Sequence, residues 1–189
     1  MSRIVVSQFV SLDGVIEDPV GIETLGRGAW SGRASSGEEG GKFKVQELMD
    51  AEAVLLGRRT YDGFFAAWPS RGGEYADRIN SMPKYVASST VKDPEWTNTT
   101  ALSGDIADEV RAVTERHDRE ILIYGSAQLT DALMQHDLVD EWRLMIFPIV
   151  VGKGKRCFGD PGRAVDMRLT ESRTVGEGVV ILVYVPARD

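Results

Sequence analysis

The chain has 189 residues, of which 42% are hydrophobic and 27% are charged, and this composition is typical of one soluble globular domain covering residues 1–189. A formal net charge of −7 argues against nucleic acid as a partner, because a phosphate backbone is bound by a basic surface. One cysteine, Cys157, excludes an intrachain disulfide, and two histidines give little support to a zinc site, so no metal is expected.

The first residues lack the pattern of a signal peptide, since the apolar alternation of MSRIVVSQFV begins almost at once and no small-residue cleavage site follows. No apolar run approaches the ~18 residues that a membrane-spanning helix requires. We therefore expect a cytoplasmic protein that does not have a membrane as its partner.

Strands and helices alternate along most of the chain, as judged by apolar runs, β-branched residues and helical spacing. The predicted strands cover 3–10, 53–56, 84–89, 120–125, 141–151, 167–175 and 179–185, and the predicted helices cover 42–52, 58–68, 105–117 and about 127–135. This order favours an α/β fold with a mostly parallel sheet and helices on both of its faces. The last two strands flank GEG and predict a C-terminal antiparallel hairpin.

The segment 17–41 is long, glycine-rich and without a regular period. Such segments inside a compact domain are usually functional lids or disordered loops. Trp30 lies in it, and a large aromatic side chain favours a lid that covers a ligand over a mobile surface loop.

The stretch VLLGRRTYDG joins a buried strand to a helix. The strand ends at Leu56, and the helix begins directly after Gly57, so its first backbone N–H groups are unpaired and attract anions. Arg58, Arg59 and Thr60 add donors suited to phosphate. A solvated helix start is the alternative, but arginines there oppose the helix dipole, which favours a phosphate site.

Two further strand ends have a similar composition. The strand 84–89 is followed by hydroxyl side chains at Ser88, Ser89 and Thr90, and the strand 120–125 is followed by Gly125, Ser126 and Ala127. Ligands of open α/β sheets lie outside the carboxyl ends of the strands. Together the three ends predict a ligand with several phosphates, such as a dinucleotide, although neither a Rossmann G-x-G-x-x-G nor a complete Walker motif is present.

Five segments in collinear order, SQFVSLDGVIEDP, LLGRRTYDGF, PKYVASST, ILIYGSAQLTDALM and LVDEWRLMIFPIVVGKGKRCF, resemble the dihydrofolate reductase-like superfamily. The nearer resemblance is to its branch related to the C-terminal reductase domain of the bifunctional deaminase-reductase of bacterial riboflavin biosynthesis. The resemblance implies a three-layer dihydrofolate reductase-like fold and an NADPH-dependent reductase. No His/Cys zinc signature of the deaminase is found.

The resemblance also implies a set of cofactor-binding residues. These are Phe9 and Ile16 near the nicotinamide, Gly57, Arg58, Arg59 and Thr60 as the adenosine-side phosphate clamp, Ser88 and Ser89 at the 2′-phosphate, and Gly125, Ser126, Ala127, Gln128 and Leu129 under the pyrophosphate. The family's run of glycines is reduced to one at Gly125, which puts the close packing of that loop in question.

Substrate recognition departs further from the family. A true dihydrofolate reductase has a carboxylate near the start of the first helix, but that register reads GGKFK here, and Glu38, Glu39 and Glu47 are nearby but out of place. Asp13 is the candidate catalytic acid, with capping of the turn before Gly14 as an equal alternative. Trp30, Phe64 and Tyr124 are expected to line a flat substrate slot. The basic loop GKGKRCF suits a ribose-phosphate, or is simply a solvated turn.

The function that follows is transfer of a hydride from NADPH to a small heterocyclic substrate, resembling 5-amino-6-(5-phosphoribosylamino)uracil reductase. The alternatives are a dihydrofolate reductase and a non-catalytic nucleotide-binding module. The nearly all-apolar strand VVILVYV needs cover on both faces, so a homodimer formed through the late strands is expected.

Overall fold

A computed structural model describes residues 2–22, 28–159 and 162–187 of the chain. Eight strands form one sheet in the order β4-β3-β2-β5-β1-β6-β8-β7. The first six strands of that order are parallel, and β8 is antiparallel to both β6 and β7. The strands are β1 (Ile4–Ser11), β2 (Ala51–Gly57), β3 (Lys84–Ala87), β4 (Thr99–Leu102), β5 (Glu120–Tyr124), β6 (Glu141–Phe147), β7 (Met167–Val175) and β8 (Val179–Pro186).

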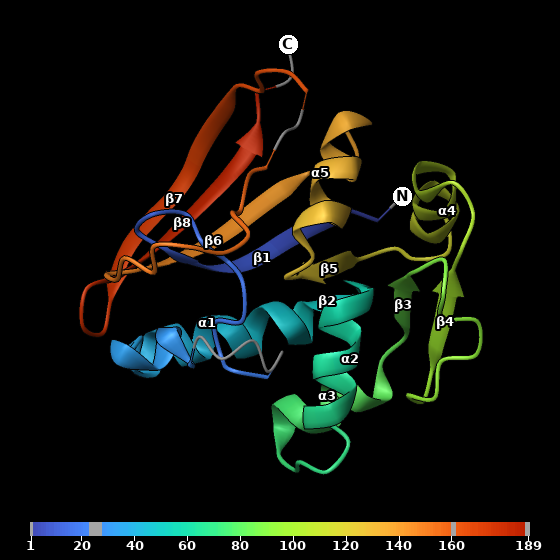
Figure 1. Ribbon diagram of the computed structural model, residues 1–189, viewed down its shortest axis with the longest axis horizontal. Helices are drawn as coiled ribbons and strands as arrows, with labels where there is room; N and C mark the ends of the chain where they lie inside the picture. The colour runs from blue at the N-terminus through green and yellow to red at the C-terminus, as the bar shows by residue number, and fades with distance from the viewer. Residues whose placement is uncertain (1, 23–27, 160–161, 188–189) are drawn as a thin grey trace.

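Helices cover both faces of this sheet (Figure 1). They are α1 (Gly37–Asp50), α2 (Arg58–Ala67), α3 (Glu74–Ser81), α4 (Ile106–Thr114) and α5 (Ala127–Gln135), with a short 3-10 helix η1 (Trp30–Arg33). Side chains of α1, α2 and α3 pack on one face, and those of α4 and α5 pack on the other. Among the described residues, no helix has both the length and the apolar character needed to cross a membrane.

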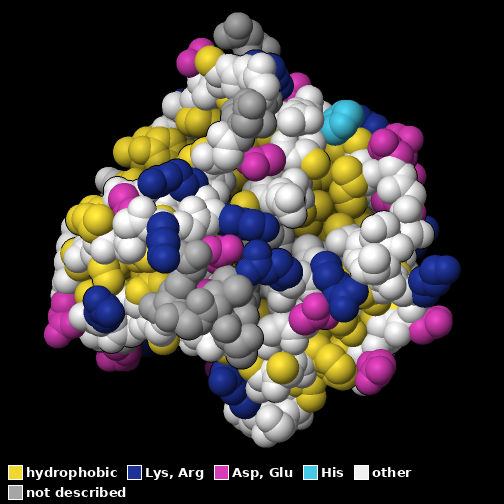
Figure 2. Space-filling model, viewed as in Figure 1, with side chains coloured by type: hydrophobic (Ala, Val, Ile, Leu, Met, Phe, Trp, Pro, Cys, Tyr) yellow, Lys and Arg dark blue, Asp and Glu magenta, His cyan; other side chains and the backbone are white. Residues whose placement is uncertain are grey.

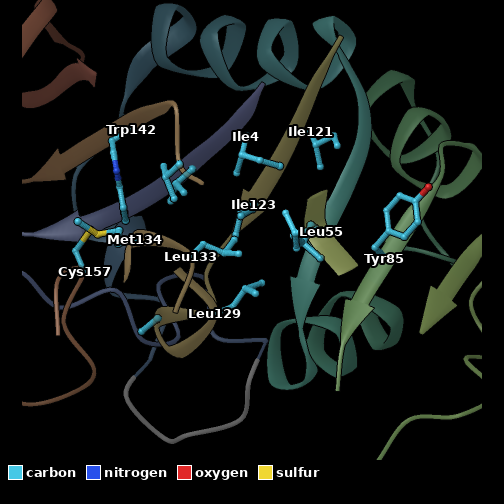
Figure 3. Packing of buried hydrophobic residues seen from close by; sticks show 14 of the residues in the cluster. Ile4, Leu55, Tyr85, Ile121, Ile123, Leu129, Leu133, Met134, Trp142 and Cys157 are labelled. Atoms are coloured by element: carbon cyan, nitrogen blue, oxygen red, sulfur yellow. The ribbon is translucent and has the colours of Figure 1, made fainter. Parts of the chain in front are cut away.

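The central strands are buried because neighbouring side chains of each strand point to opposite faces and both faces are covered. Figure 3 shows the core on one face, where Leu133 of α5 lies beside Ile123 of β5, and Leu129 and Ile121 belong to the same buried cluster. On the opposite face, Leu48 of α1 belongs to a second buried cluster. The three layers, the mostly parallel sheet and the C-terminal hairpin confirm the predicted α/β fold.

Several boundaries differ from those predicted. Helix α1 begins at Gly37 rather than at residue 42, so the end of the segment 17–41 is helical. Gly40 interrupts the helical pattern in the sequence, but it is buried, and a Cβ at this position would meet both Ser36 and Met145 of β6. Strand β6 ends at Phe147 rather than at residue 151, because Pro148 has no N–H to continue the ladder. Helix α3 and strand β4 were not predicted.

Candidate functional site

A cavity of about 380 Å³ lies at the carboxyl ends of the parallel strands β2, β3, β4 and β5. We call it the strand-end cavity. Its lining includes every predicted cofactor residue except Phe9, namely Ile16, Gly57, Arg58, Arg59, Thr60, Ser88, Ser89, Gly125, Ser126, Ala127, Gln128 and Leu129. Near the middle of the face shown in Figure 2, dark blue Lys and Arg side chains gather beside yellow apolar surface.

Two helices begin at this cavity without a side-chain cap. The first residues of α2 follow Gly57, and those of α5 follow Ser126, and neither capping residue accepts a side-chain hydrogen bond from the helix. Helix α4 is different, since the Asp105 carboxylate accepts from the N–H groups of Ala107 and Asp108 at 3.0 and 3.2 Å. The N–H groups of α2 and α5 are thus the ones available for an anionic ligand.

Ser126 explains how the loop packs with one glycine in place of the family's run of glycines. Both Gly125 and Ser126 are left-handed, with φ of +57° and +67°. A Cβ at Gly125 would lie 2.7 Å from Thr60 Oγ1, so this position needs glycine. The Ser126 hydroxyl accepts from Gly57 N at 2.7 Å and lies 3.1 Å from Thr60 Oγ1. It therefore connects the end of β2 to the end of β5.

The two adjacent arginines point to different ends of the strand-end cavity. Arg58 pairs with Asp62 at 2.7 Å and donates to Thr90 Oγ1 at 2.8 Å, beside the turn that follows β3. Arg59 pairs with Glu17 at 3.3 Å, in the segment that follows β1. Both arginine side chains are about half exposed, and so is Asp62, which places the Arg58–Asp62 pair at the rim of the cavity in contact with solvent. The Glu17 side chain is only 9% exposed.

A second cavity, of about 390 Å³, adjoins the first through the shared lining residues Ile16, Thr60 and Gly125. We call it the aromatic cavity. Its lining residues are Ser7, Gln8, Phe9, Ile16, Pro19, Val20, Ile22, Lys44, Thr60, Phe64, Trp68, Arg71, Tyr75, Tyr124 and Gly125. The structure thus brings Phe9, Phe64 and Tyr124 together, as the substrate slot and nicotinamide end require.

A buried charge cluster lies beneath the aromatic cavity. Lys44 donates to Ser7 Oγ at 2.7 Å and forms an ion pair with Glu47, whose carboxylate also accepts from Ser7 at 2.8 Å and from Tyr124 at 3.4 Å. Burial lowers the pKa of Lys44, and the Glu47 charge opposes that shift. Burial, reinforced by Tyr75 and Glu47, raises the pKa of Tyr124, so its hydroxyl stays protonated at neutral pH and can donate.

Glu47 therefore lies closer to the candidate site than the sequence suggested. It lies late in α1, far from the register in which the family has its acid, yet it is almost fully buried under the aromatic cavity. Ser7 and Tyr124 are neighbours in register on β1 and β5, so their side chains share the face that α1 covers. The signal that could have identified the cluster is the i,i+3 spacing of Lys44 and Glu47 on an otherwise apolar helical face.

Asp13 lies at neither cavity. Its carboxylate accepts from Ser11 Oγ and from the N–H groups of Val151 and Gly152 at 3.0 and 2.9 Å. The Ser11 hydrogen bond, followed by that of Val151, lowers the pKa of Asp13 to about 2. The group is ionised at neutral pH and has no proton to donate, so the geometry favours the alternative in which Asp13 fixes the turn after β1.

Trp30 is also outside the lining of both cavities. It is 2% exposed, its indole Nε1 donates to Glu17 O at 2.9 Å, and its ring contacts Phe147 edge-on at 5.9 Å. Trp30 thus holds the segment after β1 through this hydrogen bond and does not reach the aromatic cavity, whereas Pro19 and Val20 of the same segment do. The central part of the predicted lid, residues 23–27, lies outside the described residues, and the lid remains a prediction.

Sequence reasoning missed other lining residues. Ser103, Gly104 and Ile106 reach the strand-end cavity because β4 adds a fourth strand end, and that strand was not predicted. Lys155 also lines the strand-end cavity. The sequence had suggested that its loop binds a ribose-phosphate of the substrate or is simply a solvated turn. Ser7 and Tyr75 reach the aromatic cavity through tertiary packing.

Comparisons with known proteins agree with this geometry. The uncharacterized protein YyaP of Bacillus subtilis strain 168 is 29% identical over 142 residues, covering 72% of this chain and 75% of YyaP. A putative riboflavin biosynthesis protein of Shewanella sp. PV-4 superimposes with a TM-score of 0.78 at 21% identity, covering 98% and 99% of the two chains. Dihydrofolate reductase of Enterococcus faecalis, complexed with NADP(H), superimposes with a TM-score of 0.59 at 12% identity, covering 98% and 97%. These likenesses confirm the dihydrofolate reductase-like fold. The family described as the RibD C-terminal domain matches residues 2–181, and the chain therefore belongs to that family.

Proposed function

We propose that the chain is an NADPH-dependent reductase that transfers a hydride to a small heterocyclic substrate. The observation that carries the proposal is the pair of adjoining cavities, one of them polar and cationic at the strand ends and the other aromatic. A dinucleotide extends from an adenosine phosphate to a nicotinamide, and the shared residues Ile16, Thr60 and Gly125 mark where its nicotinamide would meet the second cavity.

The residues of the strand-end cavity fit this cofactor. The uncapped first turns of α2 and α5 supply N–H donors for phosphates, and Arg58, Arg59 and Lys155 supply positive charge. When bound, the reduced nicotinamide supplies the hydride, and the protein supplies binding and orientation. Membership of the RibD C-terminal domain family supports a riboflavin-pathway type of reductase.

The first substrate to test is 5-amino-6-(5-phosphoribosylamino)uracil, because the family is that of the RibD C-terminal domain. Dihydrofolate is the second. Glu47 is an acid on the first helix, but Ser7, Lys44 and Tyr124 surround it, and it is not among the residues lining the aromatic cavity. It is thus not placed to contact a pterin directly, which favours another heterocycle.

The experiment has two arms. Calorimetric titration of NADPH tests the cofactor site, and the loss of NADPH absorbance with each candidate substrate tests turnover. We expect micromolar NADPH binding and oxidation with a heterocyclic substrate. Binding without oxidation by any substrate would favour a non-catalytic nucleotide-binding module. Failure to bind NADPH would refute the NADPH-dependent reductase.

A further inference from the structure

The aromatic cavity differs chemically from the strand-end cavity. Aromatic rings of Phe9, Phe64, Trp68, Tyr75 and Tyr124 form much of its wall. Among the described residues that line it, the only cations are Lys44 and Arg71. Aromatic walls favour a flat ligand and give little stabilisation to a phosphate. The lining therefore indicates a different ligand from the polyanion expected in the strand-end cavity.

Lys44 is held in a fixed position at the floor of this cavity. Its ammonium group is bound by Ser7 and Glu47 and lies 4.6 Å from the ring centre of Tyr124 and 5.1 Å from that of Phe9. An ammonium has three N–H donors, and two of them have partners among the described residues. The third is available to an acceptor atom of a ligand in the cavity.

The charge of Lys44 is balanced from beneath. The Glu47 side chain is 1% exposed and that of Lys44 is 16% exposed, so the carboxylate neutralises the ammonium, and of the two residues only Lys44 lines the cavity. A balanced pair offers a strong donor without a net charge, which suits a carbonyl oxygen or a ring nitrogen better than a phosphate. Arg71 is exposed and stacks on Trp68, with its guanidinium 4.9 Å from the ring centre.

We propose that Lys44 is the hydrogen-bond donor that recognises a carbonyl oxygen or ring nitrogen of a flat, uncharged heterocycle in the aromatic cavity, and that this ligand needs no phosphate. The identification of this ligand as the substrate rests on the reductase function proposed above, whereas the binding site itself does not. The role of Ser7 and Glu47 is to position the ammonium.

The test measures binding of lumazine, a flat pteridine-dione, by calorimetry without cofactor. Lys44→Met should weaken binding by about tenfold to a hundredfold, because one hydrogen bond from a charged donor is lost. Since this variant leaves Glu47 buried and unpaired, the double variant Lys44→Met/Glu47→Gln removes both charges and keeps the fold testable. The control is Lys42→Met on the same helix, where Lys42 is exposed and pairs with Glu38 at 2.6 Å.

If the Lys44–Glu47 pair only stabilises the packing of α1, a folded double variant will bind lumazine as well as the unmodified protein, and the proposal fails. Absence of lumazine binding to the unmodified protein at millimolar concentration would also overturn it. A second comparison uses 5-amino-6-ribosylaminouracil and its 5′-phosphate, which should bind within about threefold of each other. Binding of the phosphate form more than tenfold tighter would refute the unphosphorylated ligand class. Because these measurements need no turnover, they stand apart from a failure of the reductase assay.

Discussion

Replacing Arg58 should reduce the preference for NADPH over NADH. NADPH differs from NADH by one phosphate on the adenosine ribose, which carries about two negative charges near neutral pH. Arg58 lies at the end of the strand-end cavity where Ser88 and Thr90 are found, and it contacts the Thr90 hydroxyl at 2.8 Å. Arg59 pairs with Glu17 near the opposite end. The structure therefore favours Arg58 of the two as the partner of the 2′-phosphate.

The magnitude follows from the geometry. A hydrogen bond to a charged group contributes roughly 1.5–3 kcal/mol, and the half-exposed guanidinium of Arg58 reduces this through solvent screening. Binding must also weaken the Arg58–Asp62 ion pair, which contributes about 0.3–0.5 kcal/mol as an i,i+4 pair. About 1–2 kcal/mol remains, so Arg58→Ala should weaken NADPH binding by about fivefold to thirtyfold. With the Ser88 and Ser89 hydroxyls included, the unmodified protein should prefer NADPH by about tenfold to a thousandfold.

Calorimetric titration of both cofactors measures the effect. Arg58→Ala should leave the dissociation constant of NADH within about twofold, and the preference for NADPH should shrink as salt rises. Asp62→Asn should strengthen NADPH binding slightly, because it releases Arg58 from its ion pair. The control is Arg111→Ala, because Arg111 has a similar exposure and pairs with Asp108 at 2.9 Å. Equal dissociation constants for the two cofactors in the unmodified protein would refute the phosphate clamp.

Three further predictions concern the fold. Ser126→Ala removes the acceptor of Gly57 N, so the free energy of unfolding measured with denaturant should fall by about 1–3 kcal/mol, and a change under about 0.5 kcal/mol would contradict this. Because the pKa of Asp13 is lower in the folded protein than the unfolded value of about 4, the ionised carboxylate stabilises the fold. The free energy of unfolding should therefore exceed that of Asp13→Asn by a constant amount above about pH 5, and this difference should disappear as pH falls towards 2. A difference that does not change with pH would be inconsistent with this role. On β8, Leu182 and Tyr184 are only half-buried, so a second subunit could cover them, and we expect a dimer by sedimentation at micromolar concentration. A clean monomer at that concentration would argue decisively against the dimer.

The strand-end cavity could be predicted because its residues are local in sequence. Each of the ends Gly57, Ser88 and Gly125 directly follows an apolar strand, and parallel neighbouring strands end at the same edge of a sheet. Once the strand order is parallel, residues far apart in the chain must converge there. The position of α5 was predicted for a related reason, since the apolar spacing of Leu129, Ala132 and Leu133 is local and helical.

The floor of the aromatic cavity could not be predicted in this way. Lys44, Glu47 and Ser7 come together only when α1 packs across β1. The i,i+3 spacing of Lys44 and Glu47 signals a pair on one face of the helix, but it does not show which strand residues that pair contacts. Ser11 is a local partner of Asp13, but the other two are similarly remote, since Val151 and Gly152 are 138 and 139 residues away along the chain. A hydrogen bond of this kind depends on tertiary packing, so a sequence pattern leaves the capping and catalytic roles of an acid equally open.

The placement of acids explains why two adjoining cavities can bind unlike ligands. At the strand-end cavity, Arg58 pairs with Asp62 at the exposed rim, where both side chains are about half exposed, so an entering phosphate can replace this carboxylate at little cost in solvation. At the aromatic cavity, Glu47 is buried and shares its oxygens with Ser7 and Lys44, so no ligand can displace it without leaving a charge unpaired. An exchangeable partner keeps Arg58 available to a polyanion. A permanent partner restricts Lys44 to donating one hydrogen bond, and the ligand that matches one donor among aromatic walls is a flat ring with one acceptor.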